Sequence, residues 1–179
     1  MFDDDAFENR NKYRETPLFK KATEILKLAN RIAEIAANYE PEKNDNHESE
    51  ILQSQAMMIR EDASIIPAKI AGAWGADLYA HKMEKAAIIR KCAKDLSLHM
   101  TSLEIYGFKE TEYLNLLRDE IEAFRILFAE WVKTFDPWNY IIDEWGLFNP
   151  PGINYDDADP DDDLPFDPDD FEDWDGDED

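Results

Sequence analysis

Residues 16–41 have the sequence TPLFKKATEILKLANRIAEIAANYEP, in which apolar residues recur at alternating steps of four and three. This period places them on one stripe of an α-helix. Thr16 suits the N-cap and Pro17 the first helical position, while Pro41 is expected to end the helix. The stripe consists of Leu18, Ala22, Ile25, Ala29, Ile32, Ala36 and Tyr39.

Three later segments, at 52–73, 83–103 and 113–135, repeat this rhythm. The connections between the four segments are short, and short connections join neighbouring helices that run in opposite directions. The sequence therefore predicts an all-α fold, an antiparallel up-down four-helix bundle over residues 16–136.

The ends, the core and the outer faces of these helices can also be predicted. We expect Asp77 to cap the third helix, Gly107 to close it and Asp136 with Pro137 to stop the fourth. The apolar stripes are wider than one helix seam needs, which predicts a second buried face and hence a homo-oligomer. The predicted core includes Ile66, Ile70, Leu96, Ile121 and Phe124.

Acidic charge is concentrated in residues 156–179. This segment holds 15 carboxylates and no Lys or Arg, in a chain of formal net charge −23. Residues 1–155 therefore carry only −8. Because a block of like charges repels itself, we expect a disordered acidic tail that acts as an interaction arm.

The chain divides into four regions by composition. A polar N-terminal arm at 1–15 precedes the bundle at 16–136, and an aromatic strap at 137–152 leads to the acidic tail at 153–179. The strap is too apolar for a solvated linker, so we expect it to pack back on the bundle. Its apolar residues are Trp138, Tyr140, Ile141, Ile142, Trp145, Leu147 and Phe148.

Composition also limits the partners and the compartment. Strong acidity argues against a simple nucleic-acid binder and against anionic membrane surfaces, and it favours a basic protein partner. The single Cys92 fits a reducing compartment. No signal peptide and no membrane span are recognisable in the sequence. We therefore expect a cytoplasmic protein of bacterial type.

Residue sets with catalytic or metal-binding spacing are missing from the sequence. Di-iron bundles use Glu-x-x-His pairs, and none of His47, His81 and His99 has a Glu three positions earlier. Cys92 lies on the apolar side of its helix and is expected to be a small buried hydrophobe. We therefore expect no enzyme activity, no catalytic residue, no metal and no cofactor.

One segment of the third helix is basic. Residues 82–94 contain five cations against Glu84 alone, a local balance of +4. A solvated helix face is the plainer interpretation. The alternative is a basic patch, repeated around an oligomer, that meets RNA or the tail. The patch consists of Lys82, Lys85, Arg90, Lys91 and Lys94.

The tail contains a string of three aspartates followed by Leu-Pro-Phe. It resembles the acidic tip of bacterial single-stranded-DNA-binding proteins, which docks into basic, apolar pockets on partner enzymes. That tip normally ends its chain, whereas 13 residues follow Phe166 here. A chance occurrence in an acidic tail is the alternative. The string is the candidate interaction motif Asp161, Asp162, Asp163, Leu164, Pro165 and Phe166.

Residues 63–72, ASIIPAKIAG, precede a long amphipathic helix and a Tyr-Gly turn. This arrangement resembles the bacterial four-helix-bundle proteins encoded in intervening sequences of ribosomal RNA genes. The accessory variability determinants of diversity-generating retroelements share that fold. The family has a Ser-Ile-Pro-Ala-Asn-Ile-Ala-Glu-Gly-like stretch in its second helix, where this chain has Lys69 for Asn and Gly72 for Glu. Residues 130–133, EWVK, are similar to the Trp-Leu-Lys ending of the accessory proteins.

The resemblance implies a ring-shaped homopentamer without enzymatic activity. In the retroelement branch it also implies binding of RNA and reverse transcriptase through a basic surface, from which this acidic body departs. We interpret the chain as a non-enzymatic oligomeric scaffold or adaptor whose acidic tail binds a basic partner or mimics nucleic acid. The alternative is an accessory RNA- or DNA-binding subunit of a retroelement-like reverse-transcriptase system.

Overall fold

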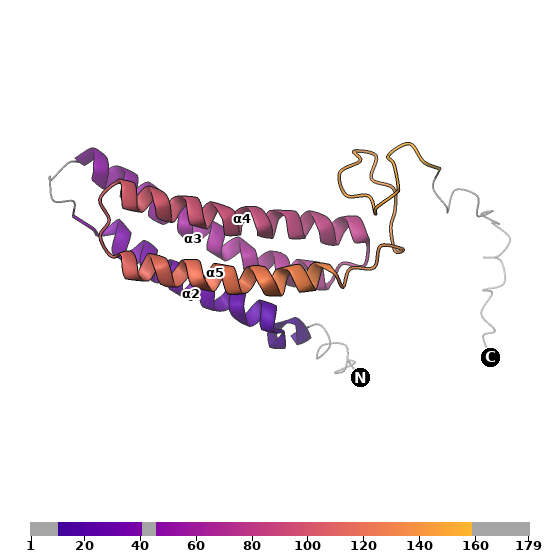
Figure 1. The fold of residues 1–179 in the computed structure, drawn as a ribbon, viewed down its shortest axis with the longest axis horizontal. Coiled ribbons are helices and arrows are strands. Elements are labelled where there is room, and N and C mark those ends of the chain that lie inside the picture. Colours follow the sequence, from indigo (N-terminus) through magenta and orange to yellow (C-terminus); the bar gives the residue numbers. More distant parts are fainter. Residues whose placement is uncertain (1–10, 41–45, 159–179) are drawn as a thin grey trace, which may run out of the picture.

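Four α-helices follow a short 3-10 helix, η1 (Lys12–Glu15), in the computed structural model, which describes residues 11–40 and 46–158. The α-helices are α2 (Pro17–Ala37), α3 (Asn46–Trp74), α4 (Tyr79–Ile105) and α5 (Thr111–Val132). They pack antiparallel in chain order (Figure 1), and the described residues contain no strand. The predicted four-helix bundle is therefore confirmed.

Two of the predicted helix ends are confirmed by their hydrogen bonds. The hydroxyl of Thr16 accepts from the amide of Phe19 at 3.2 Å, and Pro17 occupies the first turn of α2. Gly107 has φ +86° and follows α4. Its amide donates to the carbonyl of Glu104 at 3.2 Å, while the Phe108 amide donates to that of Leu103 at 2.9 Å. These are the two bonds of a Schellman motif, which needs a left-handed residue such as glycine.

Three other ends differ from the prediction. α2 and α5 end at Ala37 and Val132, several residues before the prolines expected to stop them. Side chains satisfy carbonyl groups at these two helix ends. Asn38 Nδ2 donates to Glu34 O at 2.8 Å after α2, and Thr134 Oγ1 donates to Trp131 O at 2.7 Å after α5. The expectation that Asp77 caps the third helix is wrong.

The start of α4 is capped by the strap. Leu78 occupies the N-cap position and makes no side-chain cap bond. The amide of Tyr79 donates instead to the carbonyl of Asn139 at 2.8 Å, and Asn139 Nδ2 donates to Asp77 O at 3.3 Å. A backbone far along the chain thus satisfies an end that sequence reasoning assigned to a local side chain.

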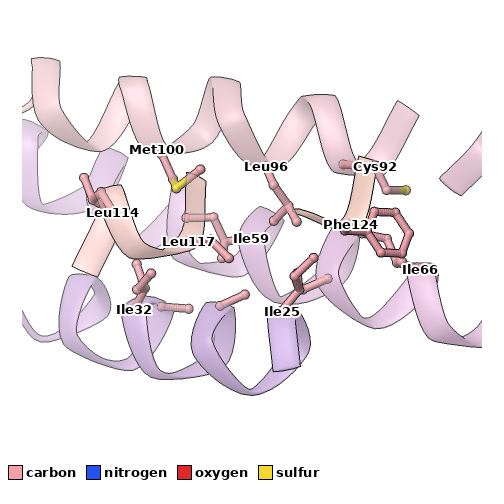
Figure 2. Close-up of a cluster of buried hydrophobic side chains, with 14 of the residues drawn as sticks. Ile25, Ile32, Ile59, Ile66, Cys92, Leu96, Met100, Leu114, Leu117 and Phe124 are labelled. Carbon is pink, nitrogen blue, oxygen red and sulfur yellow. The ribbon is translucent and has the colours of Figure 1, made fainter. Parts of the chain in front are cut away.

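The core runs along the bundle axis and is apolar throughout the described residues. Figure 2 shows its isoleucine, leucine, methionine and phenylalanine side chains projecting from the helices toward one another. Of the predicted core residues, Ile66, Ile70, Leu96 and Phe124 are buried. Ile121 is only half-buried, which corrects its assignment to the core.

Uneven packing of α5 explains the partial exposure of Ile121. Helix α3 packs closely on both α2 and α4, while α5 packs on α2 and contacts α4 far less. The loose α4–α5 boundary is therefore the place where the bundle opens a concave surface.

None of the described helices is long and apolar enough to cross a membrane.

The strap contacts the bundle but does not bury its largest side chains. Just before the strap, Phe135 is buried and its ring packs edge-on against Trp131 at 4.7 Å between centroids, and within the strap the carbonyl of Asn139 accepts from the amide of Tyr79. The amides of Trp145, Leu147 and Phe148 donate to the Asp143 carboxylate, and these bonds, Phe148 foremost, lower the pKa of Asp143. The Trp145 side chain nevertheless stays 93% exposed, so this ring does not pack back as expected.

Candidate functional site

The five cations of the predicted basic patch all lie on α4, but they do not share one surface. Lys91 is exposed and forms an ion pair with Asp95 one turn along the helix. Lys85 donates to the carbonyl of His81 at 3.3 Å, and its stem lies beside Gly72 of α3. Lys82, at the start of the helix, is half-buried.

Arg90 and Lys94 are the two patch residues that the structure brings together. They are one turn apart on α4 and border the same concave surface, facing α5. We call this surface the α4–α5 groove; its volume is about 660 Å³. The groove is lined by Arg90, Ala93, Lys94 and Ser97 of α4 and by Ile121, Glu122, Phe124, Arg125, Phe128, Ala129 and Val132 of α5.

The rim of the α4–α5 groove is positively charged. Arg125 pairs with Glu122 through two hydrogen bonds of 2.8 and 2.5 Å, so these two charges largely cancel. Within residues 11–40 and 46–158, Arg90 and Lys94 have no ion-pair partner. The four charged residues sum to +2 in a chain of net charge −23. The rim therefore attracts anions while most of the chain repels them.

The floor of the groove is apolar and aromatic. Phe124 is buried at its base, and the half-buried Phe128 lies next to it with 6.1 Å between ring centroids. Ile121 and Val132 extend the floor along α5. An apolar floor below the cations of the rim fits a ligand that carries carboxylates beside bulky apolar groups.

A bidentate ion pair closes the α4–α5 boundary away from the groove. The guanidinium of Arg118 on α5 donates to both carboxylate oxygens of Glu104 on α4, at 2.9 and 2.8 Å. This pairing lowers the pKa of Glu104 and raises that of Arg118. The two helices are thus tied at the Glu104 end of α4 and stand apart beside Arg90 and Lys94.

A second polar cluster links α3 to α4. The His99 ring places Nδ1 2.7 Å from Gln55 Oε1 and Nε2 3.1 Å from Asp62 Oδ2. The buried thiol of Cys92 hydrogen-bonds to the same Asp62 carboxylate. Burial, followed by this bond, raises the pKa of Cys92 to about 12.

The pKa of Cys92 is shifted in the direction opposite to the one that a nucleophilic cysteine requires. A reactive thiol has a lowered pKa beside a base or a cation, whereas the Cys92 thiol is buried beside the Asp62 carboxylate, and both raise its pKa. The prediction that Cys92 is buried is confirmed, and the contact with Asp62 explains how its polar hydrogen is accommodated. We assign this cluster a structural role between the two helices.

A further hollow of about 610 Å³ lies between the strap and the first turns of α4. Its walls include His81, Glu84, Ile141 and Phe148. In the part of the chain that the structure describes, no three His, Cys, Asp or Glu side chains gather as a metal site. The candidate tail motif, Asp161 to Phe166, lies outside the described residues.

Comparisons with protein-family models, with curated proteins and with solved structures find no match for this chain. The fold is therefore established by the structure as an all-α bundle, without a family assignment. The resemblance at residues 63–72 agrees with that architecture, and its finer implications enter below as proposals.

Proposed function

We propose that this protein is a non-enzymatic helical adaptor that assembles with itself and presents its acidic tail to a basic protein partner. The observation that carries the proposal is the apolar surface left on the outside of the bundle. On α4, Leu98 and Ile105 are 67% and 73% exposed, and on α3 Met57 is 69% exposed. Apolar side chains gathered on outward helix faces mark interaction surfaces.

Self-association accounts for the positions of these side chains. Leu98 and Ile105 are seven residues apart, so they lie on one stripe of α4. On α5, Leu116 and Ile126 are also about half exposed. A subunit that covers these stripes supplies the second buried face expected from the sequence, and the family resemblance favours five subunits.

Light scattering on the purified protein tests the assembly. At micromolar concentration we expect a mass several times that of the 20.9 kDa chain, with a pentamer as the favoured species. The double substitution Leu98→Glu and Ile105→Glu should reduce the mass toward that of one chain, because burying carboxylates at an interface is costly. A monomeric mass for the unaltered protein contradicts self-association.

Replacing the tail carboxylates tests the adaptor role. In residues 156–179, changing every Asp to Asn and every Glu to Gln keeps the length and removes all 15 charges. We expect the unaltered chain to capture basic proteins from a bacterial extract in a salt-sensitive manner, and the neutral variant to lose them. Retention of the same proteins by both chains contradicts a role for the acidic tail.

A nucleic-acid-binding accessory subunit is the second candidate, favoured by Arg90 and Lys94, which have no ion-pair partner in the part of the chain that the structure describes. Against it, non-specific binding comes mostly from neutralised phosphates, and a chain of charge −23 repels them. At about 150 mM salt, roughly physiological, we expect no submicromolar affinity for single-stranded RNA in fluorescence anisotropy. A submicromolar dissociation constant there would favour the accessory subunit over the adaptor.

A further inference from the structure

The α4–α5 groove is locally cationic and apolar, although the chain as a whole has a net charge of −23. Its rim holds Arg90 and Lys94, two cations with no ion-pair partner among residues 11–40 and 46–158, and its floor holds the rings of Phe124 and Phe128. We propose that this groove binds the chain's own segment Asp161 to Phe166. The docking is a property of this chain alone. Its consequence, that the tail is partly withheld from a basic partner, rests on the proposed adaptor function.

Charge complementarity is the first argument for this occupant. Three consecutive carboxylates, Asp161 to Asp163, precede Leu164 in the segment. Arg90 and Lys94 are one helical turn apart, about 6 Å along α4 at 1.5 Å per residue. In an extended strand, residues two apart lie on the same face about 6.6 Å from each other, so Asp161 and Asp163 can reach both cations at once. These pairs form beside an apolar floor, where screening by salt is weaker than on an open surface.

The apolar half of the segment matches the floor. Leu164 and Phe166 follow the aspartates directly, and Pro165 between them removes one backbone donor and restricts the backbone. A groove of about 660 Å³ has the size of a site that takes a few bulky side chains. Packing of Phe166 on Phe128 and Val132 supplies the binding energy that exposed ion pairs alone do not provide.

The anchoring of the strap makes the groove reachable. Phe148 of the strap and Glu84 of α4 border one hollow, and Arg90 follows Glu84 by six residues, about 9 Å along the helix. Phe166 follows Ala158, the last residue that the structure describes, by eight residues, which can span up to about 28 Å when extended. A tethered ligand with sufficient reach has an effective concentration in the millimolar range. Even a segment of weak affinity is therefore docked for much of the time.

Competition by a free copy of the segment tests the proposal. The probe is a fluorescein-labelled peptide of residues 159–168, added to the full chain or to the full chain with Leu164→Ala and Phe166→Ala. With an intrinsic dissociation constant of about 0.1 mM and an effective concentration of about 1 mM, the tethered segment should weaken peptide binding about tenfold. We therefore expect the Ala variant to bind the peptide about tenfold more tightly than the unaltered chain.

Matched substitutions locate the binding site. In the Leu164→Ala and Phe166→Ala background, Arg90→Glu with Lys94→Glu should abolish peptide binding. Lys91→Glu changes the same kind of charge on the same helix outside the groove, and should leave peptide binding within about twofold, because an exposed charge is largely screened. Ala129→Trp fills the groove without altering any charge and should also abolish binding. Circular dichroism verifies that each variant keeps its helices.

Three results overturn the proposal. If the peptide binds neither chain up to millimolar concentration, the groove does not take this segment. If it binds both chains equally, the segment is not docked within its own chain. If Lys91→Glu weakens binding as much as Arg90→Glu with Lys94→Glu, the attraction is general and not specific to the groove. All three use purified protein and its own peptide, so they are independent of any partner and of the adaptor function.

Discussion

Phe124→Ala is expected to lower the free energy of unfolding by about 3–5 kcal/mol. Phe124 is 2% exposed and belongs to the central cluster (Figure 2), where it lies among side chains from the other helices of the bundle. Truncation removes the apolar surface of a whole ring and leaves a cavity that the rigid helices around it fill only partly. A loss of this size is a large part of the total stability of a single domain.

Urea unfolding followed by circular dichroism measures the loss of stability caused by Phe124→Ala. The midpoint should fall while the slope of the free energy with urea concentration stays unchanged, which separates lost stability from a changed unfolded state. Protein concentration is held constant, because assembly stabilises the folded chain by mass action. Asp119→Ala, at an exposed position of the same helix, should change stability by no more than about 0.5 kcal/mol. Equal effects of the two substitutions contradict the burial of Phe124.

The bundle itself could be predicted because helical periodicity repeats the same constraint at every turn. Ile66 and Leu96 each lie on a stripe of several apolar residues, so a single misplaced residue could not alter the result. The caps at Thr16 and Gly107 were equally predictable, since each depends on residues within a few positions along the chain. Local physics and the hydrophobic pattern agree at these sites.

The predictions of helix ends that were wrong concern ends that depend on contacts between distant segments. The Asp77 carboxylate has the chemistry of an N-cap, but the Tyr79 amide at the start of α4 donates to the backbone carbonyl of Asn139 instead. The partial exposure of Ile121 has a similar origin. An apolar stripe on α5 is buried where the neighbouring helix packs closely and stays partly exposed where the neighbouring helix makes few contacts. How α5 divides its contacts between α2 and α4 is decided by side-chain packing across the bundle, which no single-helix pattern records.

Only the α4 side of the α4–α5 groove could be predicted from the sequence. Arg90 and Lys94 stand four residues apart among other basic residues, which indicated a cationic surface without indicating its depth. Arg125 and Phe128 lie more than 30 residues further along, and their place beside Lys94 follows only from the packing of α4 and α5. The contact of Asp62 with Cys92 was missed for the same reason, since it joins two helices.

Cys92 is expected to alkylate about a thousandfold more slowly in the folded protein than in the unfolded chain at about pH 8. The thiolate is the reacting species, and the folded environment raises the pKa of Cys92 to about 12 from an ordinary value of 9.0. At pH 8 the thiolate fraction is therefore about a thousand times smaller in the folded state. Burial of the side chain slows the reaction further, because reagent must reach it through the α3–α4 boundary.

Iodoacetamide labelling followed by mass spectrometry, in buffer and in concentrated urea, measures the two alkylation rates. Asp62→Asn should speed labelling of the folded protein severalfold, since it removes the anion that accepts from the thiol. Asp95→Asn is the matched control, because Asp95 contributes least among the groups that raise the pKa of Cys92. As pH rises from about 9 toward 12, the unfolded chain ionises first, so this thiol's contribution to stability is lost over that interval. Equal labelling rates in buffer and in urea contradict both the burial of Cys92 and its bond to Asp62.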